Sequence, residues 1–179
     1  MRHELILHPD SRSSAVTRIE VDVTRSAGTL QLRYIVTGKI GELRIPPLTD
    51  PARTDELWKH TCFEAFVRAP KSAAYYEFNL SPSTQWAAYH FSGYRSGMIA
   101  ATELAAPQIN VKSAAARYAL QAMVEPASSN LPGDMAWRLA LSAVIEEASG
   151  AKSYWALAHP PGKPDFHHSD CFALELGPA

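Results

Sequence analysis

The sequence predicts an all-β protein: an antiparallel β-sandwich with jelly-roll-like connectivity, about ten strands and short helical turns in its loops. Three observations favour this fold class. Apolar and polar residues alternate with a period of two in one segment after another, which is typical of half-buried strands. Clusters of Gly, Pro, Ser and Asp separate these segments. No stretch of about 15 residues shows the sustained helical spacing that an α/β fold needs between parallel strands.

The N-terminal half contains five predicted strands. The first two, Ile19–Val23 and Leu30–Tyr34, are expected to form a hairpin around Gly28. Three further alternating segments follow, at Leu57–Val67, Tyr75–Leu80 and Gln85–Phe91. The turn residues at 81–83 separate the last two, so we expect these strands to be antiparallel neighbours.

The C-terminal half repeats the pattern with five more predicted strands. They are Ile109–Lys112, Tyr118–Val124, Trp137–Ile145, Lys152–Ala158 and Cys171–Leu176. Trp137 opens the apolar face of its strand and is expected in the core. The alanine-rich segments 103–106 and 113–116 are each expected to hold a helical turn. No repeat, low-complexity tract or linker divides the chain, so residues 1–179 are predicted to form a single domain.

Charge and composition exclude several classes of protein. The 179 residues include 17 Lys and Arg against 18 Asp and Glu, a net charge of -1. This balance lacks the basic stripe of a nucleic-acid-binding protein and the polybasic segment of a membrane anchor. Neither the apolar region of a signal peptide (about 7–15 residues) nor that of a membrane helix (about 20) is found. We expect a cytoplasmic protein with Cys62 and Cys171 reduced and buried.

Metal chemistry has one candidate segment, HPPGKPDFHHSD at 159–170. Its side chains Asp165, His167, His168 and Asp170 are of the types that bind divalent transition metals. Their spacing matches no specific metal motif, and the prolines indicate a rigid loop in which Asp and His satisfy backbone groups. We therefore favour a structural role. Four common enzyme signatures, GxSxG, GxGxxG, the Walker lysine loop and HExxH, are absent.

Several ionisable side chains lie within the predicted strands. By strand parity, a face is shared by His60, Cys62 and Glu64 in one strand, by Glu77 and Asn79 in the next, and by Trp155 and His159 in a third. If these faces coincide in one sheet, they form a polar surface on which Glu64 and Glu77 could act as acid and base. Carboxylates inside strands more often face water or pair with an arginine, for which Arg53, Arg95 and Arg138 are candidates.

Aromatic residues are frequent, with four Trp and seven Tyr. Exposed tryptophan and tyrosine rings stack on the flat faces of sugars, and neighbouring polar groups then bind the hydroxyls. Trp58 and Trp86 lie close to predicted strand starts beside loops, where a ligand could reach them. Packing in the core is the more frequent role of such rings, and both interpretations stay open.

Several blocks of sequence resemble a known family. The first is Arg53-x-Asp55-x-Leu57-Trp58-x-x-Thr61-Cys62-x-Glu64-x-Phe66, followed by Tyr75-Tyr76-Glu77-Phe78-Asn79-x-Ser81-Pro82 and Trp86-Ala87-x-Tyr89-x-Phe91. Together with later segments at 137–139, 142–146, 153–157 and 163–167, they are similar to the DOMON-like proteins of bacteria, relatives of the family nine carbohydrate-binding modules. The resemblance covers most of the chain from about Arg44. It implies a β-sandwich that binds a small ligand, such as a sugar or haem, without transforming it.

Three hypotheses follow for the function. The first is a non-catalytic module that binds a carbohydrate or polyhydroxylated metabolite without a cofactor. Its expected ligand-binding residues are Arg53, Trp58, His60, Glu77, Asn79, Trp86, Trp155 and His159. The second is a haem or divalent-metal protein using His60, His159, His167 or His168. The third is a hydrolase with Glu64 and Glu77 as its paired carboxylates. A protein partner at an exposed sheet edge is a further alternative.

Overall fold

A computed structural model describes residues 1–26, 28–126 and 131–179. The described residues form twelve strands: β1 (Arg2–Leu7), β2 (Val16–Ser26), β3 (Thr29–Gly38), β4 (Cys62–Arg68), β5 (Tyr75–Leu80), β6 (Trp86–Phe91), β7 (Ile99–Ala100), β8 (Gln108–Ala114), β9 (Arg117–Val124), β10 (Trp137–Glu146), β11 (Lys152–Ala156) and β12 (Leu174–Leu176). Short 3₁₀ helices η1 (Ile40–Glu42), η2 (Leu57–Lys59) and η4 (Ser169–Cys171) lie between them. The prediction of an all-β fold is confirmed, because the described regular structure consists of strands and short 3₁₀ helices. Every named strand pair is antiparallel, which was also expected.

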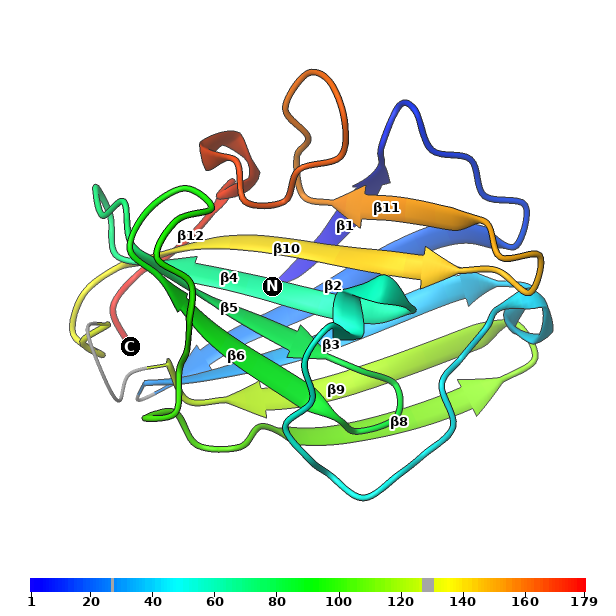
Figure 1. Ribbon diagram of the computed structural model, residues 1–179, viewed down its shortest axis with the longest axis horizontal. Helices are drawn as coiled ribbons and strands as arrows, with labels where there is room; N and C mark the ends of the chain where they lie inside the picture. The colour runs from blue at the N-terminus through cyan, green and yellow to red at the C-terminus, as the bar shows by residue number, and fades with distance from the viewer. Residues whose placement is uncertain (27, 127–130) are drawn as a thin grey trace.

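The strands form two layers (Figure 1). One layer has the order β7-β6-β5-β4-β10-β11, with β12 beside β10, and the other has the order β2-β3-β9-β8. Strand β1 joins them: its residues 2–5 pair with β2 and its residues 6–7 pair with β11. The sheet is therefore continuous, and it curls over on itself to form a sandwich.

The main core lies between the two layers and follows the alternation of the sequence. Ile19, Val21 and Val23 of β2 point inward and are at most 1% exposed. The ring of Tyr34 on β3 packs against Phe63 on β4, with centroids 5.0 Å apart. Trp137 is fully buried here, as predicted. Burial of these apolar faces supplies the driving force that holds the layers together.

A second apolar cluster covers the opposite, outer face of the β4–β5–β6–β10–β11 layer. Phe66, Tyr75 and Phe91 point outward from their strands and meet Phe166 and Phe172 from the segment after β11. That segment, orange to red in Figure 1, runs along the outside of β10. The outer face of this layer is therefore partly covered rather than open to water, which creates the setting of the site described below.

The structure corrects several predicted boundaries. The segment 57–59 forms η2, and the strand after it begins only at Cys62. Cys171 belongs to η4, so the last strand is restricted to Leu174–Leu176. The expected helical turns at 103–106 and 113–116 do not form: the first is a loop, and the second is the end of β8 with its hairpin turn. Strands β1 and β7 were not predicted. None of the described helices is long and apolar enough to span a membrane.

Candidate functional site

A cleft of about 520 Å³ opens on the outer face of the β4–β5–β6–β10–β11 layer. Strands β4, β5, β6, β10 and β11 contribute to its lining, as do the segments around residues 58, 95–98 and 164–167. The lining comprises Trp58, Glu64, Glu77, Tyr89, Phe91, Arg95, Met98, Val144, Tyr154, Pro164, Phe166 and His167. Its volume lies within the usual range for small-molecule sites, about 300–1,000 Å³.

Two glutamates from neighbouring strands lie in the floor of this cleft. In the β4–β5 register Glu64 pairs with Asn79 and Phe66 pairs with Glu77, so the two carboxyl groups are diagonal neighbours on one face. The faces of the two strands therefore coincide, which is the condition that the sequence left open. Glu64 is 3% exposed and Glu77 is 5% exposed. Each has one close donor: Ser142 Oγ lies 3.3 Å from Glu64 Oε2, and Asn79 Nδ2 lies 2.7 Å from Glu77 Oε1.

The environment of this pair favours the protonated acids. Burial, and secondly the charge of Glu77, raise the pKa of Glu64 to about 8. Burial raises the pKa of Glu77 to about 7, against the opposing effects of the Asn79 hydrogen bond and the Arg95 charge. A carboxyl that keeps its proton near neutral pH can donate a hydrogen bond or serve as a general acid.

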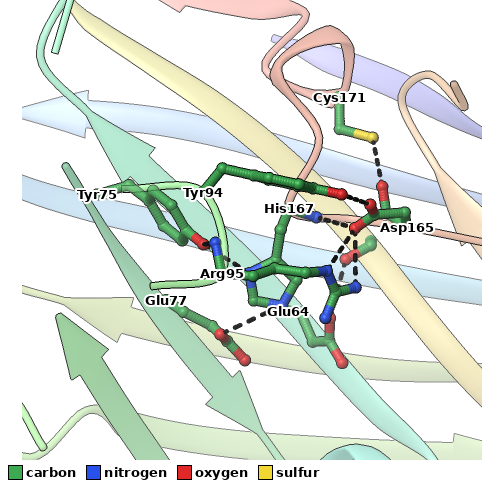
Figure 2. A network of polar contacts seen from close by, with 9 residues as sticks. Glu64, Tyr75, Glu77, Tyr94, Arg95, Asp165, His167 and Cys171 are labelled. Carbon is green, nitrogen blue, oxygen red and sulfur yellow. Dashed lines mark hydrogen bonds and ion pairs between the residues drawn. The ribbon is translucent and has the colours of Figure 1, made fainter. Parts of the chain in front are cut away.

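Asp165 lies in the loop between β11 and η4 (residues 157–168, the covering loop) and binds two residues of the segment after β6 (Figure 2). Its carboxylate accepts hydrogen bonds from Arg95 Nη2 at 2.8 Å and Nε at 3.2 Å, and a further one from the Tyr94 hydroxyl. It also accepts from the backbone N–H of His167 at 3.1 Å. Burial alone would raise the pKa of Asp165, but the bonds from Tyr94 and Arg95 outweigh it and hold the pKa below its usual value. This clamp places Arg95 and His167 at the cleft.

His167 reaches the carboxyl pair from the covering loop. Its Nδ1 lies 2.7 Å from the Tyr75 hydroxyl, which itself accepts the backbone N–H of Arg95 at 3.3 Å. The other ring nitrogen, Nε2, lies 3.8 Å from Glu77 Oε2. Burial, followed by the charge of Arg95, lowers the pKa of His167 to about 4. The ring is neutral at pH 7 and does not neutralise Glu77.

The ligand-binding residues expected from the sequence are distributed over several places. Trp58 and Glu77 line the cleft, and Asn79 supports Glu77. Arg53 lies at its edge, with its guanidinium 5.4 Å from the Tyr89 ring and 2.9 Å from Asp55. The remaining four, His60, Trp86, Trp155 and His159, do not line the cleft.

Those four residues have other contacts. His60 Nδ1 lies 2.7 Å from Glu146 Oε2, and Trp86 packs against the main core. Trp155 points to the inner face of β11 and bonds Ser153, so its face does not coincide with the face of the glutamates. His159 Nε2 lies 2.8 Å from the Ile6 carbonyl oxygen.

The metal candidates do not converge. Within residues 1–26, 28–126 and 131–179, no group of three or more His, Cys, Asp or Glu side chains is arranged to hold a metal ion. Asp165 and His167 are used as described above. His168 instead caps η4 by accepting the backbone N–H of Asp170 at 3.3 Å.

The sequence interpretation missed several cleft residues. Tyr89 and Phe91 alternate with inward-facing positions of β6, so strand parity could have identified them. Tyr154 was missed because its neighbour Trp155, which points the other way, was assigned to the polar face. Arg95 and Phe166 lie in irregular segments, where no periodicity indicates the direction of a side chain.

No protein-family model and no curated protein matches the chain. Among solved structures, the fold is similar to that of a candidate carbohydrate-binding protein from Bacteroides uniformis ATCC 8492. That match has a TM-score of 0.69 and 10% identity and covers 95% of this chain and 83% of the other. A family nine carbohydrate-binding module from Caldicellulosiruptor kristjanssonii also matches. Its complex with cellotriose has a TM-score of 0.49 (11% identity, 86% of this chain and 70% of the other). Its glucose complex has a TM-score of 0.47 (12% identity, 88% and 76%). At such low identity the first likeness shows the fold alone: a sandwich shared with a protein described as carbohydrate-binding.

Proposed function

We propose that the chain binds a small carbohydrate or related polyhydroxylated molecule in the outer-face cleft and does not transform it. The observation that carries this proposal is the lining, in which aromatic rings form the walls and buried polar groups form the floor. Rings can cover the apolar face of a sugar while polar groups bind its hydroxyls. The Bacteroides protein of similar fold is itself a candidate carbohydrate-binding protein, which supports the proposal. The motif resemblance supports the finer assignment to the DOMON-like proteins.

Trp58 is the expected stacking residue. It follows the left-handed residue Glu56, which turns the chain into η2 and presents the indole beside the cleft. The residue is 36% exposed, and the Tyr89 ring contacts the indole edge-on with centroids 6.1 Å apart. Because the indole is held in place but remains accessible, little side-chain entropy is lost when a ligand stacks on it.

Calorimetric titration with a panel of monosaccharides and disaccharides tests the proposal. At least one sugar is expected to bind with a dissociation constant at or below the millimolar range. Trp58→Ala should weaken that binding by about tenfold or more, which corresponds to the loss of a stacking contact. Leu48→Ala removes another exposed apolar side chain, outside the cleft lining, and should leave binding unchanged. Absence of binding to every sugar at millimolar concentration would refute the proposal.

Glycoside hydrolysis is the second candidate, and the buried pair Glu64 and Glu77 favours it. One carboxyl with a raised pKa and a second nearby are the groups that such a reaction needs as acid and base or nucleophile. The two functions separate in one assay with nitrophenyl glycosides. Turnover that Glu77→Gln abolishes without changing the melting temperature would establish hydrolysis. Binding without turnover by the unaltered protein would support the non-catalytic function.

A further inference from the structure

The cleft contains more acidic than basic groups. Among its lining residues in the described part of the chain, Arg95 is the single one with a permanent positive charge. Arg95 forms an ion pair with Asp165 at 2.8 Å and none with Glu64 or Glu77. His167 is neutral at pH 7, because burial lowers its pKa to about 4. Among the described residues, the charge of Arg95 therefore lowers the pKa of both glutamates from a distance, but no cationic side chain forms a contact ion pair with either.

One carboxyl oxygen of each glutamate is open to an additional donor. Ser142 reaches only Oε2 of Glu64, and no described residue donates a hydrogen bond to Oε1. Asn79 occupies Oε1 of Glu77, whereas the nearest nitrogen to Oε2 is His167 Nε2 at 3.8 Å, beyond hydrogen-bonding distance. Both side chains are more than nine-tenths buried and line the cleft, as Figure 2 shows for their position beside His167. These two oxygens are acceptors that the lining of the cleft offers to a ligand that donates hydrogen bonds.

The walls favour a cation as well as a sugar ring. Trp58, Tyr89, Phe91, Tyr154 and Phe166 surround the carboxyl pair with aromatic rings. The faces of such rings attract ammonium groups, and the attraction is larger where water is excluded. An ammonium nitrogen also carries up to three N–H donors, enough to serve both free carboxyl oxygens.

Building on the proposed carbohydrate function, we propose that the ligand is an amino sugar whose ammonium group forms ion pairs with Glu64 and Glu77. Its ring packs against the aromatic walls, and its hydroxyls contact the polar groups around the pair. The proposal concerns the chemical class only: a primary amine on a polyhydroxylated ring. An N-acetylated or unmodified sugar of the same size lacks the positive charge that would favour the ionised form of the pair.

Proton release gives this inference a specific signature. In the free protein, burial keeps protons on the pair, whereas a bound ammonium favours the ionised carboxylates. Binding near pH 6 is then expected to release about one to two protons per ligand. The other ionisable groups around the pair are Tyr34, Cys62, Tyr75, Tyr89, Arg95, Asp165 and His167. None of these has a pKa that would release a proton at this pH.

The experiment is calorimetric titration with glucosamine, N-acetylglucosamine and glucose, near pH 6 in two buffers of different ionisation enthalpy. Glucosamine is expected to bind about tenfold or more tightly than the two neutral sugars and to release protons. Glu77→Gln should remove this preference and reduce the release, and Glu64→Gln provides a second variant if one of them fails to fold. Glu147→Gln alters a buried glutamate remote from the cleft and should change neither.

The outcomes separate the two proposals. Equal binding of all three sugars without proton release would overturn the amino-sugar inference while the carbohydrate proposal stands. If no sugar binds but cyclohexylamine binds with proton release, the ammonium site is supported and the carbohydrate proposal fails. If neither sugars nor the amine bind, both proposals are refuted.

Discussion

Replacing Glu64 by glutamine should make the protein more stable at alkaline pH. The amide keeps the size of the carboxyl group and can still accept the hydrogen bond from Ser142, but it does not ionise. In the wild-type protein the pKa of Glu64 is raised by burial, so the folded state binds its proton more tightly than the unfolded state does. The stability that this proton provides is complete below the unfolded pKa and is lost as pH rises through the folded pKa.

The size of the effect follows from the shift itself. The pKa of Glu64 rises from 4.5 to about 8, and each unit corresponds to 1.36 kcal/mol. Between about pH 4.5 and about pH 8 the wild-type protein should therefore lose on the order of 5 kcal/mol of unfolding free energy relative to Glu64→Gln. That is a large part of the stability of an ordinary domain, about 5–15 kcal/mol. At pH 5 the two proteins should be almost equally stable.

Urea unfolding of both proteins at several pH values from about 5 to 9 measures this difference. Glu147→Gln is the control, because Glu147 is also buried (8% exposed) but accepts hydrogen bonds from Ser13, Ser14 and the backbone N–H of Ala15. Burial alone would raise the pKa of Glu147, but these hydrogen bonds hold the pKa below its usual value. Its glutamine variant should lose stability at neutral pH, by about 1–3 kcal/mol. A wild-type stability that stays flat from pH 5 to 8, or a Glu64→Gln variant with the same pH slope, would refute the reasoning.

Three further predictions concern other parts of the chain. Trp137→Ala should lower the free energy of unfolding by about 3–5 kcal/mol, because the indole fills the main core. Trp58→Ala should lower it by less than half of that. Equal losses in chemical unfolding would contradict the assigned positions of the two rings. Asp165→Asn should loosen the covering loop and make it cleave faster in limited proteolysis, since Arg95 and Tyr94 lose their charged acceptor; an unchanged rate would exclude the clamp. Cys62 and Cys171 are free and buried and have raised pKa values, so a thiol reagent should modify them only after unfolding; fast labelling of the native protein would disprove this.

Strand periodicity predicted most of the fold because the layers bury one face completely. The alternation at Ile19–Val23 survives in the structure, since a shift of one residue would expose the whole inner face of β2. Strand β1 escaped prediction because the outward-facing Ile6 is apolar, like Leu5 and Leu7 on either side of it. Leu5 faces the core beside β2, whereas Ile6, already paired with β11, is exposed, so its three consecutive apolar residues show no simple alternation.

The site was predicted where it lies on strands and missed where it lies on loops. Strand parity placed Glu64 and Glu77 each on a polar face of its own strand, and the β4–β5 register shows that these two faces coincide. On β11 the prominent tryptophan was chosen, but Trp155 faces the core and Tyr154 faces the cleft. The position of Arg95 depends on the ion pair with Asp165, seventy residues away in the chain. No local pattern encodes such a contact.

The acidic side chains of the buried outer face show where function departs from the requirements of folding. Glu146 is buried too, but it bonds Arg44 and His60, so the fold itself supplies its countercharge. Burial alone would raise the pKa of Glu146, yet these partners hold it low. Glu64 and Glu77 occupy comparable strand positions without such a partner, and an apolar residue there would be less costly to bury. A sequence that keeps two carboxyls in an aromatic cleft gives up stability at neutral pH, and a ligand that supplies the absent charge would restore it.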